Sequence, residues 1–150
     1  MTEVLFYHLT QSPLEANLPA ILEKSLERGW RVLVQGMDSA RLRFLDEYLW
    51  TRAEEGFLPH GIDGEGNEVA QPVLLSEGNE AVNQAHVLIL VDGARFQPAN
   101  SDGFERVCLI FDGNDAGILS AAREDWKKVK ETGWQASYWA QENGRWVKKG

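Results

Sequence analysis

The sequence predicts an α/β domain in which helices cover both faces of a mostly parallel sheet. Short apolar runs alternate with helix-like segments along the chain, which is the order that strand–helix–strand units produce. Two runs, residues 87–91 and 107–111, are continuously apolar, as expected of central strands covered on both faces. The 150 residues suit one domain, and no linker or repeat divides them. We therefore expect a single three-layer, Rossmann-like domain over residues 1–150.

The first strand and the first helix have clear local signals. Residues 4–7 form an apolar run, and Ser12 and Glu15 then stand where a helix start places its hydroxyl cap and its acidic third residue. Apolar residues at helical spacing follow over the next three turns, and a glycine supplies the stop. Pro19 interrupts this pattern, so either the helix is kinked there or it begins one turn later with Asn17 as its cap.

A second strand and a second helix are expected before a long loop. Residues 31–34 form a compact β-branched run, and Asp38 or Ser39 can cap the helix that follows. The inward face of this helix carries Leu42, Leu45 and Leu49. From residue 52 to residue 70 the periodicity weakens and glycine is frequent, so we predict a loop.

The second half of the chain continues the alternation. Residues 72–75 form a strand that precedes the two central runs, and Asp115 then caps a third helix that ends near Gly133. Residues 134–140 form a further strand, and residues 145–149 form either a short edge strand or a tail. The side chains that we expect on the inward face of the third helix are Ile118, Ala122, Trp126 and Val129.

The composition excludes several classes of protein. Fifteen Lys and Arg residues against 23 Asp and Glu residues give a formal net charge of −8, which repels a phosphate backbone, so we expect no strong direct binding of nucleic acid. The single cysteine, Cys108, lies in an apolar run and is expected to be a buried thiol in a reducing compartment. No signal-peptide pattern and no apolar run near ~18 residues is present, so we expect a cytoplasmic protein without membrane contact.

The motifs of common active sites are missing from the sequence. The turns at residues 35–38 and 112–115 hold one glycine each, and neither a P-loop nor a GxGxxG pattern is present, so we expect no nucleotide site. His8, His60 and His86 lack the paired spacing of a zinc site. No GxSxG elbow provides a serine nucleophile. We therefore expect no catalytic residues, no metal and no cofactor.

Two aspartates leave an alternative open. Asp92 and Asp112 each follow an apolar strand and precede a glycine. Asp-Gly pairs are ordinary turn signals, but carboxylates at strand ends can also hold a metal or act as a base. The second interpretation describes a nucleotide-dependent enzyme of α/β fold.

The third predicted helix carries a stripe of positive charge. Arg123, Lys127 and Lys130 stand at positions i, i+4 and i+7, which places three cations along one helix face, and Lys128 widens the patch. The stripe is either a solvated outer face or a docking site for an anionic partner. A local positive surface on an acidic chain makes the second interpretation worth testing.

Large aromatic residues mark a second candidate surface. Trp50 closes the second predicted helix, and Phe57, Pro59 and His60 lie in the glycine-flanked loop that follows. Such residues either pack on the core or act as exposed anchors of an interface. The chain has six tryptophans, which favours some exposed aromatic surface and therefore a partner.

Several segments in this order resemble the chi subunit of bacterial DNA polymerase III, and the resemblance covers essentially the whole chain. They are residues 6–9 (Phe-Tyr-His-Leu), 29–33 (Gly-Trp-Arg-Val-Leu), 45–50 (Leu-Asp-Glu-Tyr-Leu-Trp), 57–61 (Phe-Leu-Pro-His-Gly), 64–66 (Gly-Glu-Gly) and 122–127 (Ala-Arg-Glu-Asp-Trp-Lys). Any one of these segments alone would be a weak signal, and the set at this spacing is fairly specific.

The resemblance implies a non-catalytic accessory subunit of the replicative polymerase, located at the nucleoid through the replisome. Members of this family bind the small psi subunit, which attaches them to the clamp loader. They also bind the acidic, Phe-ended C-terminal tail of the single-stranded-DNA-binding protein. Their fold is similar to that of nucleotide-binding domains but lacks the nucleotide site, in agreement with the missing glycine motifs.

The resemblance also implies two sets of site residues. Arg123 and Lys127 match basic positions that pair with carboxylates of the tail. Leu119 stands where some members have a further basic residue, and Lys130, one turn beyond the matched pair, can compensate. The expected walls of the pocket for the terminal Phe are Trp126 and Phe111. The expected surface for psi, and for a repair helicase that competes with psi in some members, is formed by Trp50, Phe57, Pro59 and His60.

Overall fold

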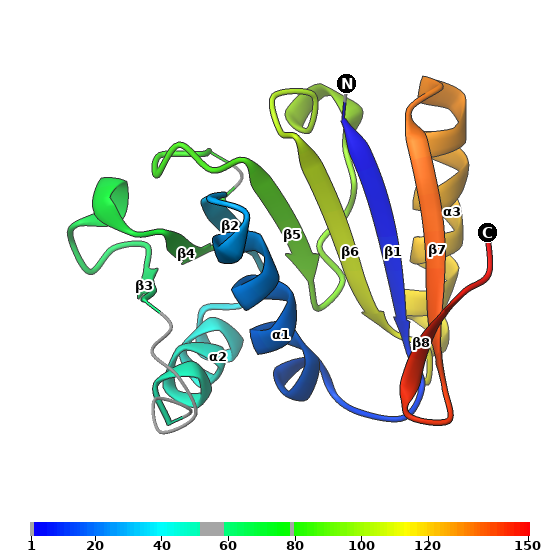
Figure 1. Cartoon of the computed structure of the whole chain (residues 1–150), viewed down its shortest axis with the longest axis horizontal. Helices are drawn as coiled ribbons and strands as arrows, with labels where there is room; N and C mark the ends of the chain where they lie inside the picture. The colour runs from blue at the N-terminus through cyan, green and yellow to red at the C-terminus, as the bar shows by residue number, and fades with distance from the viewer. Residues whose placement is uncertain (1, 52–58, 79) are drawn as a thin grey trace.

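The computed structural model describes residues 2–51, 59–78 and 80–150, and its central layer is an eight-stranded sheet (Figure 1). The strand order is β3-β4-β2-β5-β6-β1-β7-β8. The strands are β1 (Glu3–Leu9), β2 (Val32–Gln35), β3 (Gly61–Ile62), β4 (Val73–Ser76), β5 (Val87–Val91), β6 (Arg106–Asp112), β7 (Gln135–Glu142) and β8 (Arg145–Lys148). The helices are α1 (Leu14–Glu27), α2 (Ser39–Thr51) and α3 (Ala116–Thr132), with 3₁₀ turns η2 (Glu68–Ala70) and η3 (Pro98–Asn100).

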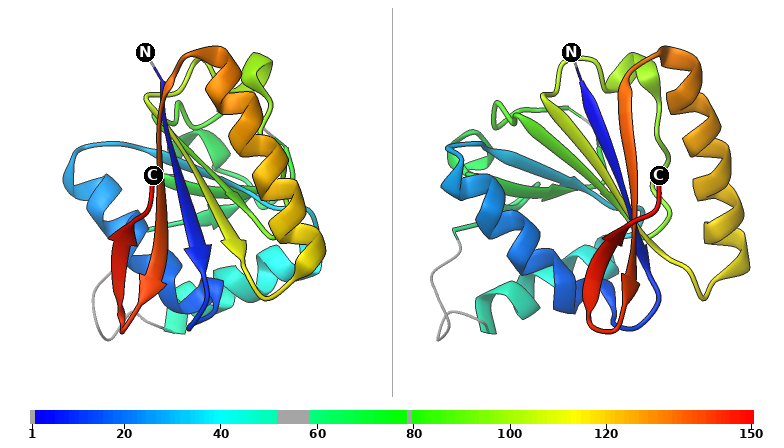
Figure 2. Two further views of the ribbon diagram at one scale, coloured as in Figure 1. Left: turned by 90° about the vertical axis from the view of Figure 1, so that its right-hand side faces the viewer. Right: turned by 45° about the vertical axis from the view of Figure 1, so that its right-hand side comes forward.

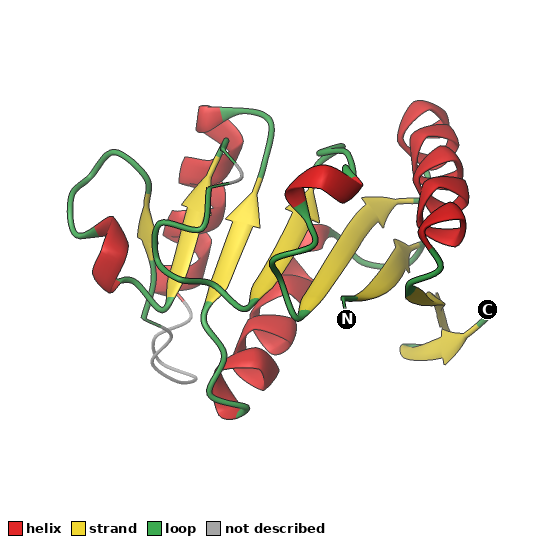
Figure 3. Ribbon diagram, turned by 90° about the horizontal axis from the view of Figure 1, so that it is seen from above, coloured by secondary structure: helices red, strands yellow, loops and turns green. Residues whose placement is uncertain are grey.

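The helices divide between the two faces of the sheet, which confirms the predicted three-layer α/β fold. Every neighbouring pair of strands is parallel except β7 and β8. One hydrophobic cluster joins the leucines of α1 and α2 to one sheet face, and a second cluster joins α3 to the other face. Figure 2 shows α3 standing apart from α1 and α2, and Figure 3 shows α3 at the opposite end of the molecule from α2. Within the described part of the chain, none of the helices combines the length and the apolar composition of a membrane span.

Alternating side chains of the strands supply the two halves of the core. In β1, Leu5 and Leu9 pack on the α1 and α2 side, whereas Val4 and Phe6 pack on the α3 side. All residues of β5 are buried, as predicted for a central strand covered on both faces.

The start of α1 differs from the prediction. The helix begins after Pro13, which has no side-chain capping bond, and it continues through Pro19 to Glu27 without a new start at Asn17. The predicted cap, Ser12, instead uses its hydroxyl as an acceptor for the Asn17 amide at 2.8 Å.

Other predicted element boundaries are confirmed by their local hydrogen bonds. Asp38 accepts from the backbone N–H of Ala40 at the start of α2, and Asp115 accepts from the N–H of Ile118 at the start of α3. Gly133 ends α3 with a φ of 78°, a conformation that favours glycine. The C-terminal segment is an edge strand, β8, which pairs antiparallel with β7.

The predicted loop at residues 52–70 contains structure that the sequence analysis missed. Gly61 and Ile62 form the short strand β3 beside β4, and the 3₁₀ turn η2 follows. Residues 52–58, which include Phe57, lie outside the described part of the chain.

Cys108 is buried in β6, as predicted, and we expect it to be unreactive in the folded protein. Burial raises the pKa of its thiol to about 12, so almost no thiolate is present at neutral pH. A disulfide reagent such as DTNB should label Cys108 only after unfolding in urea. Labelling of the native protein at the rate of the unfolded chain would contradict this burial.

Candidate functional site

The basic face of α3, formed by Arg123, Lys127 and Lys130, is exposed to solvent. No carboxylate of the described residues forms an ion pair with any of these three side chains. Lys128, which we predicted to widen this face, is also exposed, but its ammonium group lies 3.6 Å from the buried Asp125 carboxylate, which offsets part of its charge. The basic face therefore consists of three cations whose charge is available to a partner.

An aromatic cluster of Phe6, His8, Phe111, Trp126 and Tyr138 lies beneath the basic face. The Trp126 ring packs edge-on against Phe6 at 5.2 Å between centroids and against Tyr138 at 5.8 Å. Trp126 is half-buried, whereas Phe111 is only 5% exposed and supports the cluster from the core. Of the two predicted pocket walls, Trp126 is therefore the one that reaches the surface.

A cation and an aromatic ring are in contact at this site. The Lys130 ammonium lies 5.1 Å from the centre of the Trp126 ring, which is within the range of a cation–π interaction. Some members of the resembled family carry a basic residue at the position of Leu119. Here Leu119 is half-buried and packs against the hydrophobic cluster between α3 and the sheet. The surface thus offers positive charge beside an apolar ring.

His8 and Tyr138 belong to this site, although the sequence analysis did not select them. The Tyr138 hydroxyl and His8 Nδ1 are 2.8 Å apart, and the His8 ring stacks on Phe111 at 5.1 Å. Burial and then the charge of Arg123 lower the pKa of His8, while Asp112 opposes this shift. The imidazole is therefore neutral at pH 7, and the positive charge of the site comes from α3.

The glycine after β6 serves packing and not phosphate binding. A Cβ atom on Gly113 would lie 1.8 Å from His8 Nε2, so only glycine allows the loop to approach the ring this closely. The contact explains the single glycine in this turn without a nucleotide.

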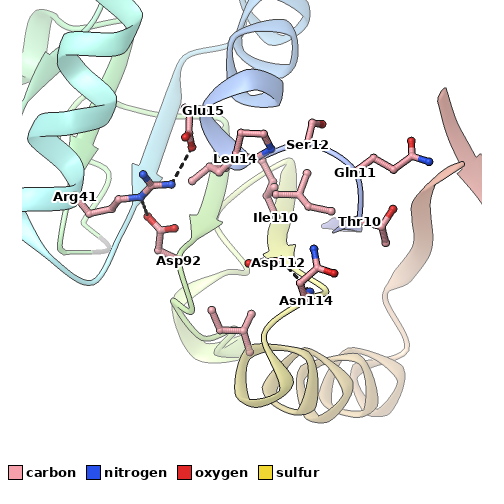
Figure 4. A pocket seen from close by; sticks show the side chains of 13 residues that line it. Thr10, Gln11, Ser12, Leu14, Glu15, Arg41, Asp92, Ile110, Asp112 and Asn114 are labelled. Atoms are coloured by element: carbon pink, nitrogen blue, oxygen red, sulfur yellow. Dashed lines mark hydrogen bonds and ion pairs between the residues drawn. The ribbon is translucent and has the colours of Figure 1, made fainter. Parts of the chain in front are cut away.

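The strand-end aspartates of the alternative hypothesis line a cavity of about 410 Å³ at the carboxyl ends of β1, β5 and β6 (Figure 4). Arg41 pairs with Asp92 at 2.9 Å and with Glu15 at 3.1 Å, and Asp112 accepts from the backbone N–H of Asn114. Ligands of α/β sheets often bind at this location, where the chain reverses its winding direction. Three carboxylates against one guanidinium disfavour a phosphate group, and the described residues show no nucleotide site.

The loop between β1 and α1 is closed by a side chain from β7. Gln141 Oε1 accepts hydrogen bonds from the backbone N–H groups of Thr10, Gln11 and Ser12 at 2.9, 2.9 and 3.3 Å. The Gln141 amide nitrogen in turn donates to Ser12 Oγ at 2.7 Å. The donors that a nucleotide-binding loop would direct at a phosphate are therefore already used within the chain.

Replacing Gln141 by alanine is expected to lower the free energy of unfolding by about 1 kcal/mol, because water can replace most of the lost bonds at this exposed loop. Urea unfolding measures the change. The amides of Thr10 and Gln11 should also exchange hydrogen faster in this variant. Gln135→Ala, on an exposed position of the same strand, is the matched control and should change stability by less than about 0.5 kcal/mol. Equal effects of the two substitutions would contradict the role of Gln141.

The second candidate surface is the α2 edge, formed by Asp46, Trp50 and His60. Trp50 is 45% exposed, and its ring lies 4.1 Å from that of the buried His60. His60 Nε2 lies 3.1 Å from both the backbone oxygen and Oδ1 of Asp46. Burial raises the pKa of Asp46, and the His60 charge opposes this rise.

The predicted psi-binding residues differ in their exposure to solvent. Trp50 presents aromatic surface, the buried His60 ring packs against it, and Pro59 is half-buried. Phe57 lies outside the described residues, so its prediction remains open.

Comparison with known proteins gives consistent results over nearly the full length. Residues 1–137 match the family described as DNA polymerase III chi subunit, HolC. The DNA polymerase III subunit chi of Haemophilus influenzae is 28% identical over 130 residues, which cover 86% of both chains. That of Pseudomonas aeruginosa is 30% identical over 140 residues, or 89% of this chain and 93% of the relative. That of Escherichia coli K12 is 38% identical over 80 residues, or 49% of this chain and 54% of the relative.

The family match extends from the first strand into β7 and therefore includes both candidate surfaces. It agrees with the segments that carried the resemblance and with the three-layer fold. The chain belongs to the family of DNA polymerase III chi subunits, which are accessory subunits of DNA replication.

Proposed function

We propose that this chain is an adaptor that holds psi at the α2 edge and the acidic C-terminal tail of the single-stranded-DNA-binding protein at the basic face. The observation that carries the proposal is the placement of the two surfaces. α2 and α3 cover opposite faces of the sheet and lie at opposite ends of the molecule (Figures 1 and 3). Two partners can therefore bind at once without competing for the same surface.

The basic face matches the chemistry of an acidic tail. Arg123 and Lys127 pair with tail carboxylates, and Lys130 adds a third charge one turn further along. The apolar terminal side chain of the tail packs against Trp126, whose ring lies beside Lys130. An acidic chain that captures an acidic tail needs such a local reversal of charge.

The α2 edge supplies the contact with psi. Exposed tryptophans are frequent anchors of protein interfaces, and the Trp50 ring is held in place by its contact with His60. A repair helicase that uses the same surface would compete with psi for Trp50. Psi in turn connects the chain to the clamp loader.

Tethering makes a weak tail contact sufficient for function. When psi fixes the chain to the polymerase assembly, the tail on coated DNA meets a high local concentration of its binding site. The polymerase is then held near its template without a tight individual contact. The chain itself is non-catalytic in this role.

Reversing both matched charges, in Arg123→Glu/Lys127→Glu, is expected to weaken tail binding by about tenfold or more, because two attractions become repulsions. Titration of a fluorescent tail peptide against each variant measures the change. Arg43→Glu is the matched control, since it reverses an exposed charge on α2, which covers the opposite face of the sheet, and should leave tail affinity unchanged.

Salt should weaken the wild-type complex and have less effect on the double variant. Equal tail affinities of the wild type and the double variant would exclude the basic face as the tail site. A loss of equal size in Arg43→Glu would show a general effect of net charge.

A further inference from the structure

A groove of about 300 Å³ lies between α1 and the β7–β8 hairpin, away from both surfaces described above. On this face of the sheet, α1 contacts β2 and β6, and α2 contacts β3 and β4. None of the described helices covers β7 and β8 here. Figure 2 (right) shows one end of α1 beside the hairpin.

Three aromatic rings form the apolar lining of the groove. Trp146 packs edge-on against Tyr7, with 5.0 Å between ring centroids, and Trp139 is the register partner of Tyr7 in the neighbouring strand. All three side chains are half-buried, and Ile21 of α1 completes the apolar wall. Aromatic rings in a concave, half-buried setting suit the insertion of one large apolar side chain.

The rims of the groove are positively charged. Lys24 lines the groove on the α1 side. Lys148 is not a lining residue, but it is the antiparallel register partner of the lining residue Trp139, which places it on the same face of the sheet next to the groove. Neither ammonium group has a carboxylate partner among the described residues, whereas Arg106 in the floor is neutralised by Glu3 at 2.8 Å. On a chain of net charge −8, both rims therefore reverse the prevailing sign.

We propose that this groove docks a short acidic segment of a partner protein, which inserts one large apolar side chain between α1 and the hairpin. Charge complementarity selects an acidic partner, and the aromatic lining selects the apolar insert. A nucleic acid would meet the repulsion of the whole acidic domain, so a peptide is the favoured occupant. The groove lies on the sheet face opposite the basic face, so this site is independent of the tail site.

Indole N–H signals of the ¹⁵N-labelled full chain provide the test, because Trp139 and Trp146 report on the groove and Trp126 reports on the basic face. The probe is the amidated peptide Ac-Glu-Asp-Phe-Asp-Glu-NH2, which has no terminal carboxylate. We expect it to shift the signals of Trp139 and Trp146. A shift of Trp126 would report separate binding at the basic face, and Lys127→Glu should reduce that shift without changing those of the groove indoles. The same peptide with alanine in place of phenylalanine should bind more weakly.

Two variants separate groove binding from other causes. Lys24→Glu should weaken peptide binding by about fivefold or more, and Ala20→Trp, from an exposed position of α1 that lines the groove, should block it. Lys127→Glu, which alters the tail site, should leave it unchanged. If Ala20→Trp does not fold, Lys24→Glu alone decides the result.

The proposal is overturned if neither groove indole signal shifts when the probe is present at about 1 mM. Binding with a dissociation constant above this concentration would be too weak for specific recognition of a peptide. It is also overturned if only Trp126 shifts, if Lys24→Glu leaves the groove shifts unchanged, or if oligothymidylate shifts the groove indoles more strongly than the peptide. If the peptide does not bind the groove but the tail still binds the basic face, only the groove proposal is overturned, and the proposed adaptor function is unaffected.

Discussion

Phe6→Ala is expected to lower the free energy of unfolding by about 3–5 kcal/mol, because it removes a fully buried ring and leaves a cavity. The Phe6 ring contacts both Trp126 and Tyr138, so the cavity would open under the basic face of α3. Urea unfolding gives the loss of stability. Tail binding by the folded fraction should also weaken, since Trp126 loses its main aromatic support.

Phe44→Ala is the matched control for this substitution. Phe44 lies on α2, is 43% exposed and contacts Tyr48 and Arg41, so its removal should cost less than about 1 kcal/mol. Comparable losses from Phe6 and Phe44 would mean that the aromatic cluster is not part of the stable core.

Asp125→Ala is expected to cost about 2–4 kcal/mol of stability. Asp125 is 1% exposed, and its carboxylate binds the Arg95 guanidinium through both oxygens and accepts from the backbone N–H of Phe96 at 3.1 Å. These bonds fasten the segment before η3 to α3. Removing them leaves the Phe96 N–H buried without an acceptor, whereas the partly exposed Arg95 can be solvated again.

Glu124→Ala provides the comparison for Asp125. Glu124 also pairs with Arg95, at 3.0 Å, but it is exposed, so its loss should cost less than about 1 kcal/mol. Chemical unfolding of both variants measures the difference. An Asp125→Ala protein as stable as Glu124→Ala would show that this buried carboxylate contributes little.

The sequence was sufficient to predict elements whose signals are local. Asp38, Asp115 and Gly133 mark helix ends through bonds within a few residues, and the apolar run of β5 reflects burial on both faces. The spacing of Arg123 and Lys127 predicted one exposed helix face, which the structure confirms. In each case the information lies within one or two turns of the chain.

Features that depend on distant residues could not be predicted in this way. Ser12 has the local signal of a helix cap, but Gln141, 129 residues away in sequence, holds the loop in another arrangement. The pairing of His8 with Tyr138 spans 130 residues and requires the adjacency of β1 and β7. Strand β3 has only two residues and forms because β4 offers it a free edge.

The role of individual lysines also depends on tertiary contacts. Lys128 lies next to Lys127 in sequence, but it projects from the helix about 100° further around the axis, close to the buried Asp125 that stands three residues earlier. The spacing of the basic residues predicted the positive charge of α3, but it could not separate the lysine that pairs with a carboxylate from those that do not. Whether a lysine has a carboxylate partner depends on the three-dimensional positions of the surrounding residues, which the sequence alone does not give.

The adaptor function is tested most directly by measuring tail-peptide affinity in the absence and in the presence of saturating psi. If the α2 edge and the basic face act separately, the dissociation constant should change by less than about twofold, and a complex of all three components should be detected by its mass. Displacement of the tail peptide by psi, or failure of psi and the tail to occupy the chain together, would contradict the account.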